Sequence, residues 1–260
     1  MEVPVLSGWV LALLGGSASA LAIGGSLGLH VARRRQWRAA SYSRPNAGTG
    51  AERPLFRGVL HAGGAAAALA AGYGLAAAAP DATARLAALI SGSALLVMLA
   101  TSAGYHVIVW RARWNEWLMR IDHANIFVVI AATYTPLLVL EPGGWHGTWL
   151  RGIWLGASAG ATAKLATPRW PGWLSSAICC AFAWAPTPAV LSHAPAIGRP
   201  GVSLTITAGT IYTAGAVVYA LRIPDLWPHT FGFHEVWHLI VLVATGIQWW
   251  VIADTVIPRL

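Results

Sequence analysis

Five polar side chains lie in otherwise apolar stretches and have the types and spacing of a metal site: Ser102, His106, Asp122, His234 and His238. Ser102 and His106 are four residues apart, as are His234 and His238, so each pair shares one face of a helix. Three imidazoles with a nearby carboxylate suit Zn²⁺, because three nitrogen ligands leave a fourth coordination position for water. The pattern predicts that the three histidines bind Zn²⁺, provided that the helices bring them together.

Each histidine, taken alone, has a simpler interpretation than metal binding. An ionisable side chain inside a membrane helix is costly unless it is paired, hydrated or bound to metal. The alternative to a metal site is therefore a set of histidines that are hydrated near the lipid headgroups. His61 and His123 fall in the same layer and are rival ligands. The remaining histidines, expected to be solvated at helix ends or in loops, are His30, His146, His193 and His229.

A second interpretation concerns the string His234-Glu235-Val236-Trp237-His238, which satisfies HExxH. In a metalloprotease the two histidines of this motif bind zinc and the glutamate is the general base. An intramembrane protease of this kind also needs a metal-binding aspartate from a later helix. Only Asp254 follows, about four helical turns away, and it cannot reach the histidines. A protease is therefore the minor alternative.

The composition is that of a membrane protein. Charged residues make up 10% of the 260 residues, hydrophobic residues make up 57%, and the mean hydropathy is +0.59. A soluble domain carries about 25% charged residues. The net charge of +8 could indicate a protein that binds nucleic acid, but the sequence has no basic helix or RNA-binding motif. We therefore expect membrane lipids, and no nucleic acid, as partners.

Apolar stretches of about 20 residues, the length that spans a bilayer as a helix, recur along the chain. Seven of them form a core, at 57–79, 86–109, 122–140, 149–166, 172–193, 202–221 and 235–257, and an eighth precedes them at 5–31. We predict an all-α, polytopic transmembrane seven-helix bundle with one additional N-terminal membrane helix. Residues 1–52 would form that helix and a basic cytoplasmic linker, and residues 53–260 the seven-helix domain.

The distribution of positive charge predicts the orientation. With the arginine cluster at 33–57 placed in the cytoplasm, 13 of the 17 Lys and Arg residues fall inside and four outside. The seven-helix core then begins in the cytoplasm and ends outside. All five site residues fall in one layer near the cytoplasmic surface of a cell (inner) membrane.

Three glycines in the stretch 149–166 are spaced by four residues: Gly152, Gly156 and Gly160. Small residues at this spacing let two membrane helices approach closely. We expect this stretch to pack tightly against a neighbouring helix rather than to form a substrate site.

Four strings, taken in order, resemble the hemolysin III family. They are Arg53-Pro54-Leu55-Phe56-Arg57-Gly58-Val59-Leu60-His61; Ser102-x3-His106; Arg120-Ile121-Asp122-His123-Ala124-Asn125-Ile126-Phe127 running on to Thr133-Tyr134-Thr135-Pro136; and Phe233-His234-Glu235-Val236-Trp237-His238. The resemblance spans residues 53 to 257. That family groups with the progestin and adipoQ receptors, which include the adiponectin receptors, and with membrane hydrolases such as alkaline ceramidases.

The resemblance implies a seven-helix bundle with zinc near the cytoplasmic side. His106, His234 and His238 would bind the metal, Asp122 would hold or activate water, and Ser102 would be a polar companion. The helix at 5–31 departs from the usual seven. Hemolytic activity is a weaker implication than the metal site.

Two functions from different classes remain open. The first is a zinc-dependent hydrolase of lipid amides or esters, in which the metal polarises the carbonyl and Asp122 takes a proton from the attacking water. The second is a non-enzymatic receptor or pore in which a structural zinc ties helices together. A structural zinc usually has four protein ligands, so a set of three favours the hydrolase.

Overall fold

The computed structural model describes residues 54–260, apart from 141–142, 168–169 and 228. Throughout this part the chain is helical and forms no β-sheet, which confirms the all-α prediction for the described residues. The additional helix expected at 5–31 and the basic linker after it lie outside the described residues.

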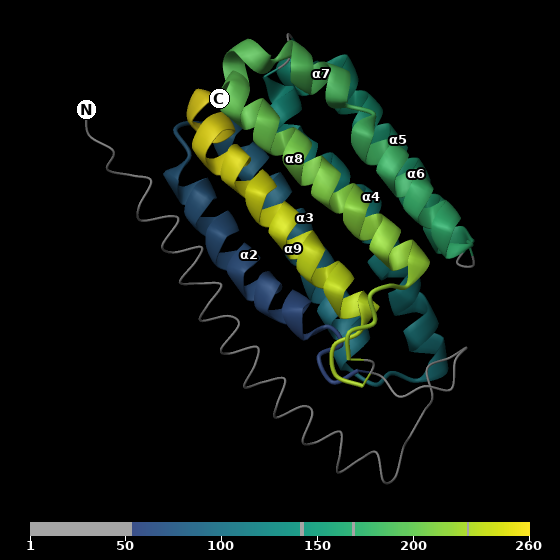
Figure 1. The fold of residues 1–260 in the computed structure, drawn as a ribbon. Helices are drawn as coiled ribbons and strands as arrows, with labels where there is room; N and C mark the ends of the chain where they lie inside the picture. Colours follow the sequence, from purple (N-terminus) through teal and green to yellow (C-terminus); the bar gives the residue numbers. More distant parts are fainter. Residues whose placement is uncertain (1–53, 141–142, 168–169, 228) are drawn as a thin grey trace.

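The long helices run antiparallel to one another along the chain (Figure 1). Their bounds are α2 (Val59–Ala78), α3 (Ala82–Val107), α4 (Ala112–Val139), α5 (Thr148–Ala166), α6 (Gly172–Trp184), α7 (Thr187–Ser192), α8 (Ala194–Leu221) and α9 (Phe233–Trp250). Consecutive helices α2 to α5 pack as neighbours, α8 packs on α9, and α9 also contacts α2. The first turns of α2, α4 and α9 and the last turn of α3 therefore lie at the same end of the bundle, which we call the histidine end.

Six helical segments are long and apolar enough to cross a membrane. They are Val59–Ala78, Ala82–Val107, Arg113–Val139, Gly172–Ser192, Ala194–Leu221 and Phe233–Arg259. The 19-residue helix α5 is not among them, although it packs against α4 within the same bundle. The described part of the chain is therefore a multi-span membrane protein built from helices.

Some predicted helix boundaries differ from those of the structure. Helix α4 begins at Ala112 rather than at residue 122, so Asp122 lies in its third turn instead of at its start. In α4, charged residues end the apolar stretch that the prediction used. They do not end the helix, which continues as long as its backbone hydrogen bonds do. Helix α8 starts at Ala194, but its backbone is kinked at Gly198, where φ is 79° and ψ is 153°, so the unbroken helix begins close to the predicted residue 202. The single helix expected at 172–193 is divided into α6 and α7.

Helices α2 and α3 approach each other backbone to backbone at Gly72 and Gly92. A Cβ atom built on Gly92 would lie 3.0 Å from the Cα atom of Gly72. In α5, Cβ atoms on Gly156 and Gly160 would strike the rings of Phe182 and Phe127, whereas one on Gly152 would meet nothing within 4 Å. The close packing expected of α5 is confirmed for two of its three glycines.

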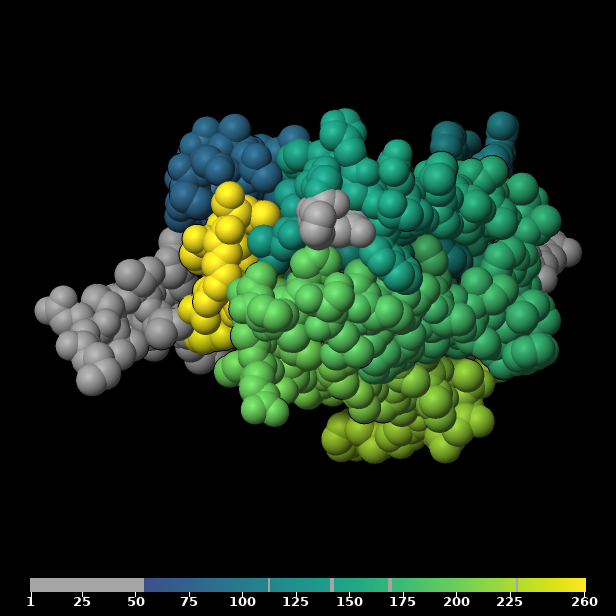
Figure 2. Space-filling view, turned by 90° about the horizontal axis from the view of Figure 1, so that it is seen from above, coloured from purple at the N-terminus to yellow at the C-terminus, as the bar shows by residue number. Residues whose placement is uncertain are grey.

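The C-terminal residues close the other end of the bundle. Helix α9 continues into a π-helical turn, Val251–Val256, and a 3-10 turn, Ile257–Arg259. Val256 and Ile257 are buried, the first beside Ile197 and the second beside Ala79. Figure 2 looks down on this end, where the yellow C-terminal residues lie between blue residues of the first helices and green residues of α8.

We predict that Gly92→Ala lowers the stability of the bundle by about 1–3 kcal/mol, because the added methyl group meets backbone that cannot rotate away. The matched control is Gly152→Ala, where the same methyl group enters open space and raises helix propensity, so stability stays equal or rises by up to about 1 kcal/mol. Thermal unfolding of both variants in detergent measures the difference. Equal melting temperatures would contradict the close approach of α2 and α3.

Candidate metal centre

Three imidazoles meet at the histidine end of the bundle. His106 comes from the last turn of α3, and His234 and His238 come from the first two turns of α9. One nitrogen atom from each ring lies within 4.8 Å of the others, and the Nε2 atoms of His106 and His234 are 3.2 Å apart. Residues 128 positions apart in the sequence are thus brought together as the sequence predicted.

Two of the three rings are enclosed by the protein. His106 and His238 are buried, with 6% and 3% of their surface exposed. The Nδ1 atom of His238 is buried without a hydrogen-bond partner among the described residues. Buried polar atoms are usually satisfied, and a metal ion is one partner that could satisfy converging nitrogen atoms. This group could hold a metal ion.

Asp122 and Ser102 lie beside the histidines. The Oδ2 atom of Asp122 is 3.8 Å from Nε2 of His106. The Ser102 hydroxyl interacts with the Asp122 carboxylate, and its Oγ atom is also 2.8 Å from Nδ1 of His61. If the hydroxyl donates to the carboxylate, it must accept from His61. A carboxylate thus lies next to the imidazoles, and a serine hydroxyl connects it to His61.

The two rival ligands lie close by but outside the group of three. The His61 ring stacks on the His238 ring, with centroids 3.7 Å apart and planes 14° apart. Its Nε2 atom is buried without a hydrogen-bond partner in the described part of the chain. His61 therefore acts on the site by packing and through Ser102. His123 lines the adjoining cavity from the turn that carries Asp122.

The glutamate of the HExxH string is not available as a base. Glu235 is completely buried. Its Oε1 atom is 2.5 Å from Nε of Arg57, and its Oε2 atom accepts a hydrogen bond of 2.8 Å from the backbone N–H of Gly232. Both oxygen atoms are therefore engaged in structural contacts. The protease alternative thus loses its general base.

The same contacts fix where α9 begins. Before α2, the backbone N–H of Leu55 donates a hydrogen bond to the carbonyl of His229, and the N–H of Phe56 donates one to the carbonyl of Thr230. The donor–acceptor distance is 3.1 Å in both. Arg57 then reaches Glu235 in the first turn of α9. The segment before α2 and the loop before α9 are thus joined directly beneath the histidines. This role of Arg57 was not predicted, because the sequence shows the residue only within a resembling string and among the cytoplasmic charges, without its partner.

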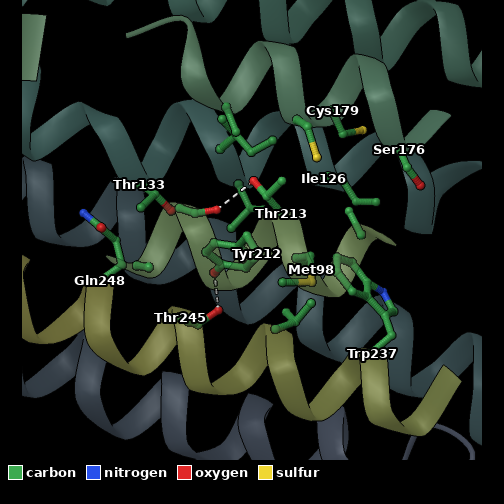
Figure 3. A pocket seen from close by; sticks show the side chains of 18 of the residues that line it. Met98, Ile126, Thr133, Ser176, Cys179, Tyr212, Thr213, Trp237, Thr245 and Gln248 are labelled. Carbon is green, nitrogen blue, oxygen red and sulfur yellow. Dashed lines mark hydrogen bonds between the residues drawn. The ribbon is translucent and has the colours of Figure 1, made fainter. Parts of the chain in front are cut away.

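A cavity of about 270 Å³ opens next to the metal centre. One wall carries polar residues of the site: His61, Ser102, Asp122, His234 and His238. From there it runs along the bundle, where apolar, hydroxyl and thiol side chains line it (Figure 3). Trp237, Thr245 and Gln248 come from α9, Tyr212 and Thr213 from α8, Cys179 and Ser176 from α6, Ile126 and Thr133 from α4, and Met98 from α3. The cavity can thus hold an apolar molecule with one end at the histidines.

We predict that Glu235→Gln lowers the stability by about 1–3 kcal/mol, because it leaves the Arg57 guanidinium without its buried counter-charge. The exposed pair of Arg120 and Glu116 provides the control: Glu116→Gln should change stability by about 0.5 kcal/mol or less. Chemical or thermal unfolding compares the two. A Glu235→Gln variant as stable as the wild type would show that this ion pair does not hold the site together.

Most of this chain is similar to a family of known proteins. Residues 49–249 match the family described as "Haemolysin-III related". "Hemolysin-3 homolog" of Bacillus subtilis (strain 168) is 29% identical over 154 residues, which cover 59% of this chain and 69% of that protein. "Hemolysin-3" of Bacillus cereus is 29% identical over 143 residues, which cover 53% of this chain and 61% of that protein. Since the family match spans most of the chain, this protein belongs to the hemolysin III family.

Proposed function

We propose that this protein is a zinc-dependent hydrolase of lipid amides or esters. The observation that supports this most is the position of three converging imidazoles and a carboxylate at one end of an elongated, largely apolar cavity. A lipid whose acyl chain lies in the cavity would place its polar linkage at the histidines. The shape of the cavity would then bring the bond to be cleaved next to the catalytic groups.

The residues fit a zinc ion held by His106, His234 and His238. Three neutral imidazoles are a common protein ligand set for catalytic zinc. The buried Nδ1 atom of His238, which has no partner among the described residues, adds support, because a polar atom enclosed in this way favours binding to a ligand. When bound, zinc would polarise a carbonyl and favour the ionised form of water.

Asp122 is the proposed general base. Its carboxylate is 3.8 Å from His106 and can accept a proton from a water molecule between the histidines and the cavity. Ser102 holds the carboxylate from one side and is itself held by His61. His61 and Ser102 are buried, so this orientation is not disturbed by bulk water. The three residues thus position one proton acceptor towards the cavity.

We also propose the full topology of seven spans. Helix α5 would be the remaining span, because it connects the two ends of the bundle beside α4 even though its own sequence is less apolar. With 13 of 17 positive charges inside, the histidine end would face the cytoplasm and the C-terminus would lie outside. The additional membrane helix at 5–31 belongs to the same proposal.

A second candidate is a receptor or pore in which zinc is structural. The ligands come from α3 and α9, so a metal ion would cross-link two helices that are far apart in the sequence. The name "Hemolysin-3" of the relative from Bacillus cereus is in keeping with a pore. The geometry favours the hydrolase, since a purely structural zinc usually has four protein ligands.

Metal binding is tested first. We expect about one zinc per chain, and we expect His234→Ala or His238→Ala to remove most of it, because two ligands hold zinc poorly. The control is His193→Ala, whose ring lies outside the cluster, at the far end of α7. Elemental analysis of purified protein gives the ratio. Full zinc occupancy in a His234→Ala, His238→Ala double variant would rule out the proposed ligands.

The role of Asp122 separates the two functions. Asp122→Asn keeps the size of the side chain but removes the base, so we expect zinc content to stay near the wild-type level while turnover of lipid amides falls about 10²-fold or more. With a structural zinc, the variant changes stability only, because there is no hydrolysis to lose. Zinc content, melting temperature and hydrolysis are measured side by side. Wild-type protein that holds zinc and cleaves no lipid in a broad panel would end the hydrolase proposal.

A further inference from the structure

A lysine is buried in the wall of the same cavity. Lys164 lies in the last turn of α5, at the histidine end, and only 3% of its surface is exposed. The ion pairs found among the described residues join other side chains, namely Arg57 with Glu235, His106 with Asp122, and Arg120 with Glu116. Lys164 is therefore a buried residue that has no carboxylate partner in the described part of the chain.

The neighbours of Lys164 do not neutralise it. The Nζ atom lies 4.3 Å from the centre of the Trp170 ring, which stabilises a cation without cancelling its charge. Its charge acts on His123 and Cys179, neither of which is an ordinary counter-ion for lysine. Lysines near helix ends usually extend to water, where they are hydrated. A lysine that is instead enclosed beside a cavity is expected to have an anionic partner.

The lysine and the metal centre share the cavity. Lys164, His123 and Trp170 line it together with Asp122 and His238. His123 directly follows Asp122 in α4, so it connects the surroundings of the lysine to those of the proposed base. A molecule that reaches the histidines with one group can therefore reach Lys164 with another.

We propose that Lys164 binds an anionic group, a carboxylate or a phosphate, on the headgroup of the lipid that occupies this cavity. The inference deepens the proposed function and rests on it for the position of the lipid. The acyl chain would lie along the apolar part of the cavity, the amide or ester at the histidines, and the anionic group on the leaving-group side against Lys164. The substrate class is then an anionic lipid amide or ester rather than a neutral one.

Two matched pairs of lipids test the charge preference and identify the anion. The first pair is N-oleoylglycine and its neutral amide, N-oleoylglycinamide. The second pair is N-oleoyl phosphoethanolamine and its neutral counterpart, N-oleoylethanolamine. Binding to the full chain in a neutral detergent is followed by tryptophan fluorescence, since Trp170 and Trp237 line the cavity. We expect the anionic member of at least one pair to bind about tenfold more tightly, as for a charge-assisted hydrogen bond.

Variants on one helix attribute the preference to Lys164. Lys164→Met keeps the aliphatic stem and should reduce the ratio of affinities to about one, and Lys164→Arg should retain it. Arg151→Met is the matched control, because it removes an exposed positive charge from the other end of α5 and should leave the ratio unchanged. Zinc content should be the same in all three variants, since none of these residues belongs to the ligand group.

The outcomes separate this inference from the hydrolase proposal. Equal binding of both members in both pairs by the wild type overturns the inference without the use of any variant. A Lys164→Met variant that loses stability but keeps the preference overturns it too, because the lysine is then only structural. Selective binding without cleavage upholds the anion site and refutes the hydrolase. If all four lipids bind with equal affinity and are cleaved, the hydrolase proposal is upheld and the anion site is refuted.

Discussion

The ion pair between Arg57 and Glu235 is the constraint on which the site depends. It joins the residues before α2 to the first turn of α9, and the backbone hydrogen bonds of Leu55 and Phe56 reinforce the connection. His234 lies next to Glu235 in the chain, and His238 lies one turn further along the same helix. Because a buried charge must keep its partner, any displacement of α9 that moved the histidines would also break this pair.

The cavity combines chemistries that are costly to place inside a membrane protein. Along most of its length it offers apolar side chains and hydroxyl groups, and at the histidine end it gathers imidazoles, a carboxylate and an ammonium group. Membrane proteins bury ionisable groups mainly where these groups pair or act on a ligand. Glu235 belongs to the first kind, since Arg57 neutralises it. Asp122 and Lys164 line the cavity, where a bound ligand could reach them.

The prediction of the bundle succeeded and failed for identifiable reasons. Apolar stretches of membrane-spanning length identify the helices, because a backbone in lipid must satisfy its own hydrogen bonds. The same criterion predicts α4 ten residues too short, since the segment from Ala112 to Ile121 carries charges yet is helical. Glycine spacing in α5 predicted close packing, but it could not show that Gly152 faces open space. A helix face acquires its neighbour only when the bundle assembles.

By itself, the sequence determined the helical class and the membrane environment, and it singled out the three histidines that converge in the structure. Imidazole chemistry and a four-residue spacing point to His234 and His238, and the resemblance to the hemolysin III family adds His106, with His61 and His123 left as rivals until the helices are placed. Only the tertiary structure decided which polar groups remain available for chemistry. The glutamate between the two α9 histidines is fully engaged by Arg57 and Gly232, whereas Lys164, which looks like an ordinary loop charge in the sequence, is enclosed beside the cavity. The physical reason is that pairing and burial depend on contacts between distant segments, which no local pattern encodes.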